Sequence, residues 1–312
     1  MFGIVLEQII FLAVILAVGF ISVKIKWVPE ELIALLPKLM LNVLLPFLII
    51  SSIVNSGTRE EVIAVWPFIF VILFMFVMGL IVGFITGKIL KLEQPVLSTH
   101  ICSSTYLNSV LVGLPILDAV FPDMSGIYLA AYLIVETVMT WVVAVAILSS
   151  ASTGKVSINL KKMLTPSTIA LVIALIMKFM DLQPSGMIWE ALKGIGSTQK
   201  YLGLMYIGMD VARRGFKKLF ENPKVFFVAP IKLIIMPVVF FFIVKMTGLI
   251  SDEMLLAATI FAMLPTMMIV TVLATEHDAA PEYAVASLLV TTVGCLFTMP
   301  FVLPFLSNFC TL

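Results

Sequence analysis

The chain has 312 residues, of which 62% are apolar and 12% are charged. About a quarter of the residues in an ordinary soluble domain are charged. This composition, with a mean hydropathy of +1.18, therefore excludes a soluble enzyme and indicates an integral membrane protein. A net charge of +1 offers no basic surface for nucleic acid, and the three cysteines lack the spacing of a disulfide framework.

The sequence predicts ten transmembrane helices, separated by short charged or Pro- and Gly-rich connections. A helix needs about 20 apolar residues to cross the hydrocarbon core of a bilayer, and stretches of that length recur along the whole chain. They are residues 4–23, 31–54, 65–87, 97–119, 125–149, 166–182, 188–211, 225–248, 254–275 and 281–306. No connection between them is long enough to hold a soluble domain.

Positive charge is distributed unequally between two sets of connections. Those after odd-numbered spans hold most of the lysine and arginine, namely Lys24, Lys26, Lys88, Lys91, Lys155, Lys161, Lys162, Arg213, Arg214, Lys217, Lys218 and Lys224. The opposite side holds Arg59, Lys178, Lys193 and Lys245. By the positive-inside rule, we expect the first set in the cytoplasm and both chain termini on the outer side of the cell membrane.

The longest connection, residues 151–165, divides the chain into two halves of five predicted helices each, 1–150 and 166–312. An odd number of helices per half inverts one half relative to the other, an architecture typical of secondary transporters. The fourth span of each half contains a proline, Pro115 in the first and Pro265 in the second. We therefore predict an all-α membrane protein of two inverted five-helix repeats, in which helices 4 and 9 are broken.

The two prolines indicate a binding site. Proline has no N–H, so the carbonyls of Leu111 and Phe261 lose their helical partners. In a membrane, such a break persists only where protein groups or water in a cavity donate hydrogen bonds to the freed carbonyls. Polar side chains are dense around the breaks: Ser103, Ser104, Thr105, Asn108 and Ser109 at the first, and Thr266, Thr271 and Thr275 at the second. The alternative is that the prolines are two ordinary kinks, whose freed carbonyls accept hydrogen bonds from these neighbouring side chains. The prolines occupy matching positions in the two halves, however, and this favours a binding site.

Some ionisable residues lie well inside predicted spans, where a charge is costly. Glu136 and Lys200 are near the middle of spans five and seven. Either Lys200 pairs with an acid such as Glu136, or it faces a watery cavity and binds an anionic substrate. Release of Lys200 by protonation of Glu136 would couple transport to protons. Lys38 and Lys232 are nearer the cytoplasmic side, where a lysine can extend to the membrane surface, and Lys232 is also a candidate for ion coupling.

Other functional signatures are missing from the sequence. The chain has two distant histidines and no H-E-x-x-H motif, so we expect neither a metal site nor a cofactor. It has no phosphate-binding loop for ATP-driven pumping, and no G-x-S-x-G motif or mid-span Asp pair for an intramembrane enzyme. These patterns favour a protein that is not an enzyme.

Four motifs in order resemble those of the auxin efflux carrier family, which includes the plant PIN exporters and bacterial malonate- and malate-type carriers. They are Asn42–Phe47, Thr105–Pro115, Leu202–Gly208 and Leu264-Pro265. The resemblance covers essentially the whole chain. Leu107 stands where the plant proteins have the crossover proline, so we expect the break one turn later, at Pro115. Glu136 stands where bacterial relatives commonly have Asn.

The resemblance implies that helices 1, 2, 6 and 7 form a scaffold, often dimeric. Helices 3–5 and 8–10 would form a transport domain that moves like an elevator, with helices 4 and 9 crossing at their prolines. The expected substrate-binding residues are Ser104, Thr105, Asn108, Gly113, Pro115, Lys200, Tyr206, Pro265 and Thr266. The expected coupling residues are Glu136, Lys200 and Lys232.

The function predicted from these features is secondary transport of a small organic anion across the cell membrane, driven by a gradient of protons, of sodium or of the anion itself. The nearest alternative is a sodium-coupled symporter of the bile-acid type, in which Ser104, Thr105, Asn108 and Glu136 could supply oxygen ligands to the cation. A channel or a sensor built on the same fold is the third possibility.

Overall fold

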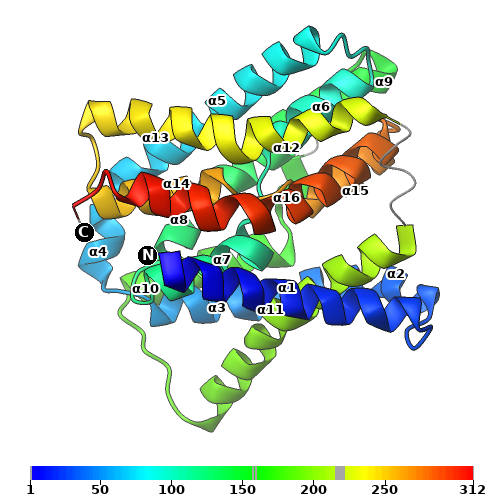
Figure 1. The fold of residues 1–312 in the computed structure, drawn as a ribbon. Helices are drawn as coiled ribbons and strands as arrows, with labels where there is room; N and C mark the ends of the chain where they lie inside the picture. The colour runs from blue at the N-terminus through cyan, green and yellow to red at the C-terminus, as the bar shows by residue number, and fades with distance from the viewer. Residues whose placement is uncertain (1, 157, 159, 215–221, 312) are drawn as a thin grey trace.

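The computed structural model describes residues 2–156, 158, 160–214 and 222–311, and the regular structure in these ranges is helical (Figure 1). The α-helices are α1 (Phe2–Lys24), α2 (Glu30–Leu39), α3 (Leu45–Asn55), α4 (Arg59–Ala64), α5 (Trp66–Ile89), α6 (Val96–Thr105), α7 (Leu114–Val120), α8 (Ser125–Val138), α9 (Val145–Thr153), α10 (Pro166–Phe179), α11 (Met187–Arg214), α12 (Val228–Pro230), α13 (Met236–Thr247), α14 (Asp252–Ala262), α15 (Met268–Glu276) and α16 (Pro281–Ser307). The π-helical segments are η1 (Met40–Leu44), η2 (Ser109–Gly113), η3 (Met139–Ala144) and η7 (Ile231–Ile235), and the 3₁₀ segments are η4 (Leu160–Met163) and η6 (Pro223–Phe227).

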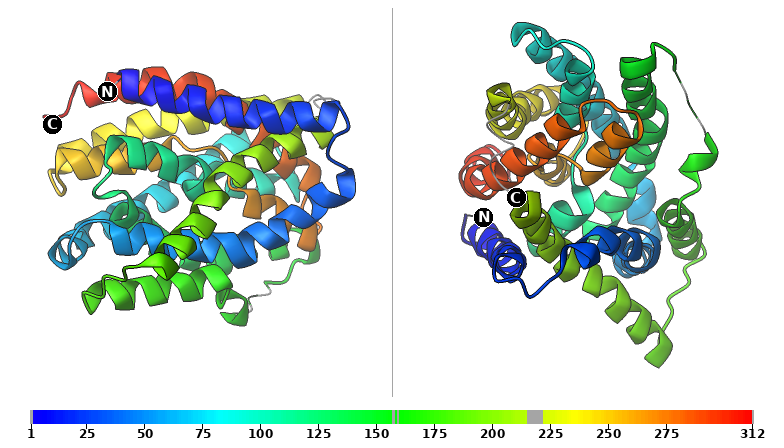
Figure 2. Two further views of the ribbon diagram at one scale, coloured as in Figure 1. Left: turned by 90° about the horizontal axis from the view of Figure 1, so that it is seen from below. Right: turned by 90° about the vertical axis from the view of Figure 1, so that its right-hand side faces the viewer.

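Helices occupy all ten ranges predicted from hydropathy. Six continuous helical segments of the described chain are long and apolar enough to cross a membrane: Phe2–Lys24, Glu30–Asn55, Trp66–Ile89, Ser125–Ala151, Pro223–Thr247 and Pro281–Ser307. Shorter apolar helices extend over Ser109–Val120 and Pro166–Phe179. The described N- and C-terminal helices α1 and α16 lie side by side, and their outer ends are at the same end of the molecule (Figure 2).

Two of the ten predicted spans are interrupted. α6 ends at Thr105 and helix resumes at Ser109, while α14 ends at Ala262 and α15 begins at Met268. The second break contains Pro265, as predicted. The expectation of a first break at Pro115 is wrong, because that proline lies in the first turn of α7 in a helix continuous with η2. Backbone bonds from Gly113 and Leu114 to carbonyls five residues earlier widen the preceding turn, which makes room for the proline ring.

The helices α1 and α11 approach each other closely through glycines. A Cβ atom at Gly19 would lie 2.0 Å from the carbonyl oxygen of Met205, and one at Gly208 would lie 2.0 Å from that of Leu16. Glycine is therefore required at both positions for the two backbones to touch. This contact also explains the last residue of the motif Leu202–Gly208 noted in the sequence.

Aromatic packing fixes the first break in the interior. The rings of Tyr132 on α8 and Phe261 on α14 stack with centroids 4.4 Å apart, and Tyr106, in the break, contacts Phe76 of α5 at 5.6 Å. The Tyr106 hydroxyl donates to the carbonyl of Met139 at 2.6 Å. The break is thus held by side chains from α5, α8 and η3, so it is a built part of the fold.

The basic connections are described in part. Arg213 pairs with Asp210 at 2.7 Å, and Lys162 pairs with Glu276 of α15. Lys217 and Lys218, from the densest basic run, lie outside the described residues.

Candidate functional site

The two chain breaks cross and hydrogen-bond to each other. The N–H of Asn108 donates to the carbonyl of Pro265 at 2.9 Å, and the N–H of Met267 donates to the carbonyl of Tyr106 at 3.0 Å. Leu107 and Thr266 form an isolated antiparallel bridge at the centre. Each break thus satisfies part of the backbone of the other, which is what a helix interruption in the interior of a membrane protein needs.

Lys232 lies at this crossing, fully buried. It comes from η7, and its Nζ donates to the carbonyls of Ser103 at 2.6 Å and Tyr106 at 2.8 Å. Thr266 completes the cluster, because its hydroxyl donates to the Ser103 carbonyl at 2.8 Å and lies 3.5 Å from Nζ. The expectation that Lys232 extends to the membrane surface is therefore wrong. Its amine faces the C-terminal end of α6, the negative end of the helix dipole.

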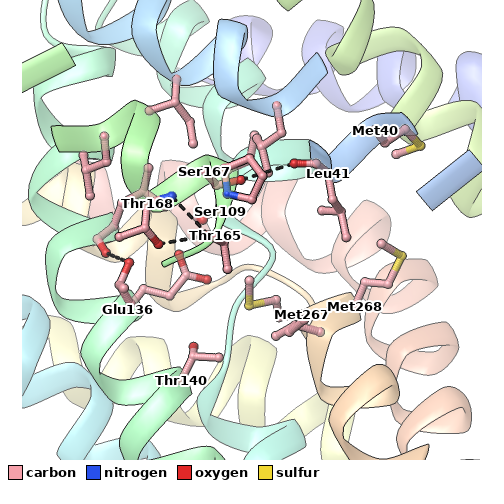
Figure 3. A pocket seen from close by; sticks show the side chains of 18 of the residues that line it. Met40, Leu41, Ser109, Glu136, Thr140, Thr165, Ser167, Thr168, Met267 and Met268 are labelled. Atoms are coloured by element: carbon pink, nitrogen blue, oxygen red, sulfur yellow. Dashed lines mark hydrogen bonds between the residues drawn. The ribbon is translucent and has the colours of Figure 1, made fainter. Parts of the chain in front are cut away.

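A cavity of about 310 Å³, which we call the Glu136 pocket, opens beside the crossing (Figure 3). Its walls come from η1 and α3, from η2, from α8 and η3, and from the starts of α10 and α15. Apolar side chains such as Met40, Met267 and Met268 form most of the wall, and Figure 3 shows Ser109, Glu136 and Thr140 among the polar groups around it. The arrangement suits an organic molecule held by a few polar contacts.

Several buried polar atoms that line the Glu136 pocket have no hydrogen-bond partner. They are Nδ2 of Asn108, Oγ of Ser109, Oε1 of Glu136, Oγ1 of Thr140 and Oε1 of Gln199. Buried polar atoms are almost always paired in folded proteins. Five unpaired atoms around one cavity therefore indicate that a ligand or water fills it.

The electrostatics of the Glu136 pocket combine one acid with three helix starts. Among the described residues that line it, Glu136 is the one with an ionisable carboxyl or amine. η2, α10 and α15 all begin at the cavity, and helix N-termini favour negative charge. Asn108 caps the N–H of Leu111 at 3.4 Å and Thr165 caps that of Thr168 at 3.1 Å, whereas the start of α15 has no side-chain cap. The first N–H groups of α15 are therefore placed to bind an anion.

Of the substrate-binding residues predicted from sequence, Asn108 lines the Glu136 pocket directly. Pro265 and Thr266 form the crossing beside it. Thr105 donates to its own helix at 2.8 Å and packs against Gly79 of α5, and a side chain at Gly113 would meet Leu264. Ser104, Pro115 and Tyr206 are buried but outside the cavity wall.

Lys200 lies elsewhere than predicted. It pairs with an acid, as one of the two expected alternatives had it, but the acid is Asp118 of α7 and not Glu136. Its neighbour Gln199 lines the Glu136 pocket instead. Successive helix residues point about 100° apart, so the side chains of Gln199 and Lys200 leave α11 in different directions.

Sequence reasoning also missed several residues of the Glu136 pocket. They are Asn42, Thr140, Thr165, Ser167, Thr168, Gln199, Met267 and Met268. The available signal was a hydroxyl or amide inside an apolar stretch, as at Asn42 and Thr140. The sequence does not show which of these side chains point to a common cavity.

A family model described as membrane transport protein matches residues 4–303 of the chain. No curated protein matches it. The matched range includes both breaks, Lys232 and the whole Glu136 pocket.

Proposed function

Because the chain belongs to the auxin efflux carrier family, whose members are membrane transport proteins, we propose that it is a secondary carrier of a small organic anion. The substrate binds in the Glu136 pocket, beside the crossing of the two breaks. The observation that carries this proposal is the set of unpaired polar atoms around one largely apolar cavity. A carboxylate would accept hydrogen bonds from Asn108 Nδ2 and from the free N–H groups of α15, while the methionines contact the organic body.

Glu136 supports coupling to protons. An anion and an ionised Glu136 would repel each other in a cavity whose described wall contains no lysine or arginine. A proton taken up by Glu136 together with the anion removes this repulsion, so that proton and anion bind as a neutral pair.

Lys232 argues against a sodium ion at the crossing. A sodium ion there would use the carbonyls of Ser103 and Tyr106 and the hydroxyl of Thr266 as ligands. These oxygens already face the ammonium group of Lys232. A bile-acid-type sodium symport mechanism is therefore less well supported than proton coupling.

The proposed architecture is two inverted repeats of five membrane spans each, with both termini outside the cell membrane. The positions of the two breaks, each fourth in its half, support this arrangement. Helices α1, α2–α3, α10 and α11 form the scaffold, through which two copies dimerise, and the other spans form the moving domain. The packing of α1 on α11, and of α3 on α10 and α11, supports this grouping. Movement of the second group along the first carries the Glu136 pocket across the membrane.

The test is counterflow in proteoliposomes. The purified protein is reconstituted with internal malonate, malate or indole-3-acetate, and uptake of the same labelled acid is measured. A carrier gives saturable counterflow, which a sensor or a channel does not. Asn108→Ala should reduce uptake at subsaturating substrate about tenfold or more, because the contact to the carboxylate is lost.

A matched control is Thr292→Ala. Thr292 is also buried and polar, but its hydroxyl donates within its own helix to Leu288 at 2.7 Å, away from the Glu136 pocket. Counterflow should persist in this variant. Absence of counterflow with every acid, in protein that remains folded, would contradict the proposed function.

A further inference from the structure

A second cavity lies at the other end of the same helix interface. We call it the Lys200 pocket; its volume is about 260 Å³, and Asp118 and Lys200 are in its wall. Helices α3, α7 and α11 line it, and α3, η2 and α11 also contribute to the Glu136 pocket. Since η2 and α7 are one continuous helix, the same three helical segments border both cavities.

The spacing along these segments separates the two cavities. Asn108, at the start of η2, lines the Glu136 pocket, and Asp118, near the end of α7, lines the Lys200 pocket. Ten helical residues correspond to about 15 Å. The cavities therefore lie about half a membrane thickness apart along the helical segment formed by η2 and α7.

The chemistry of the Lys200 pocket differs from that of the Glu136 pocket. Its wall is mainly hydroxyl and amide, from Ser51, Ser52, Asn55, Ser125 and Ser197. Hydroxyl and amide groups can donate hydrogen bonds to anions; here Ser51 and Ser197 donate to the carbonyls of Leu48 and Gly194 in their own helices. Two lysines in the wall supply positive charge: Lys193, which pairs with Glu190 on its own helix, and Lys200, which is held by Asp118 in an ion pair that joins α11 to α7.

The Lys200–Asp118 pair is accessible enough to exchange. The side chains are 26% and 34% exposed, respectively. Ion pairs that water reaches contribute little to stability and re-form easily with other ions. A carboxylate arriving in the pocket offers Lys200 the same chemical partner as Asp118.

We propose that the Lys200 pocket is a second binding site for the carboxylate of the transported acid, where Lys200 exchanges Asp118 for the substrate. This inference rests on the proposed function. Exchange also removes a link between α11, in the proposed scaffold, and α7, in the proposed moving domain. Binding of the substrate would therefore weaken the contact between the proposed scaffold and the proposed moving domain before the moving domain changes position.

The test uses protection of a single cysteine. Ser197→Cys places a thiol in the Lys200 pocket, in a Cys310→Ser background; the other cysteines, Cys102 and Cys295, are buried. The rate of maleimide labelling is measured in detergent against increasing malonate or indole-3-acetate. At least one acid should slow labelling, and Lys200→Gln should raise the half-protecting concentration about tenfold or more. Asp118→Asn should lower it several-fold, because Lys200 is then free.

Two further measurements make the result decisive. The charge-exchanged variant Asp118→Lys/Lys200→Asp re-forms the pair in reverse, and should restore folding if a single variant is unstable. Lys245→Gln is the control, since it breaks an ion pair of 2.5 Å with Asp252 away from both cavities; it should leave protection unchanged.

The possible outcomes separate the two proposals. An acid that raises the melting temperature in an Asn108-dependent way, with labelling that is unprotected or independent of Lys200, overturns this inference alone. Absence of both the melting shift and the protection with every acid tested, in folded parent protein, overturns the proposed function as well.

Discussion

At the scale of single residues, Lys232 is a buried amine whose partners are neutral oxygens. Its three contacts come from both breaks, so it links two parts of the chain that are far apart in sequence. Burying a charge is costly unless hydrogen bonds compensate. Here the compensation comes from carbonyls at the end of α6, which need donors in any case.

Replacing Lys232 by Met should therefore destabilise the protein. The carbonyls of Ser103 and Tyr106 would each lose one donor and retain one, the Thr266 hydroxyl and the Met267 N–H respectively. Each lost hydrogen bond costs about 0.5–1.5 kcal/mol, so we expect a fall in melting temperature of about 2–8 °C in detergent, followed by tryptophan fluorescence. Lys38→Met is the control, since Lys38 is exposed. Equal effects of the two substitutions would contradict the role of Lys232 at the crossing.

Glu136 gives a second residue-scale prediction. In the parent protein, uptake of the acid into proteoliposomes should rise when the outer pH is lowered, because Glu136 must take up a proton with the anion. Glu136→Gln mimics the protonated side chain, so uptake should continue by exchange but lose most of its response to a pH gradient. The measurement is initial uptake between pH 5.5 and pH 8. Glu60→Gln, on the exposed surface of α4, is the control and should keep the pH response of the parent protein. If Glu136→Gln also kept the full pH response, Glu136 would not be the residue that couples transport to protons.

At the scale of helices, the α1–α11 contact predicts a sharp difference between two glycines on one helix. Gly208→Ala would place a methyl group 2.0 Å from the carbonyl of Leu16, so the helices must separate. Overpacking of this kind costs about 1–3 kcal/mol or more. Gly194→Ala, also on α11, meets nothing within 4 Å and should raise stability slightly, since alanine favours helix. Thermal unfolding of both variants checks this; a tolerated Gly208→Ala would refute the close contact.

Helices and breaks differ in how well they could be predicted from sequence. All ten ranges predicted from hydropathy contain helix, because length and apolar composition are local properties, whereas the polar helix α4 lies in a predicted connection. The second break also followed, since Pro265 lies inside it. The first break was misplaced at Pro115 because the widened turn of η2 accommodates that proline, while Tyr106–Asn108 leave the helix for partners in the other half of the chain.

The site was harder to predict for a related reason. Asn108, Glu136 and the two crossing segments stood out as polar or helix-breaking residues in apolar spans. The partners of Lys200 and Lys232 did not, because they are 82 and 129 residues away in sequence. The partner that each lysine contacts depends on how its helix is rotated about its own axis. The apolar residues are distributed almost uniformly around these helices, so the sequence does not indicate that rotation.

At the scale of the whole molecule, the two pockets differ in charge along one interface. The Glu136 pocket contains an acid without a lysine or arginine in its described wall, and the wall of the Lys200 pocket contains one acid, Asp118, and two lysines, Lys193 and Lys200. Under the proposed function, an anion binds at one end by replacing Asp118 and at the other end together with a proton. Anion binding in the Lys200 pocket would then depend on ionic strength, whereas anion binding in the Glu136 pocket would depend on pH.

The glycine contact between α1 and α11 has a practical consequence for measuring motion. Two backbones that touch at Gly19 and at Gly208 cannot slide along each other without a clash. A spin label at Val14, which is 57% exposed on α1, would therefore keep a constant distance to a label on α11. Because the distance between these two labels stays constant, they serve as a fixed reference. The displacement of a third labelled helix can then be measured relative to them.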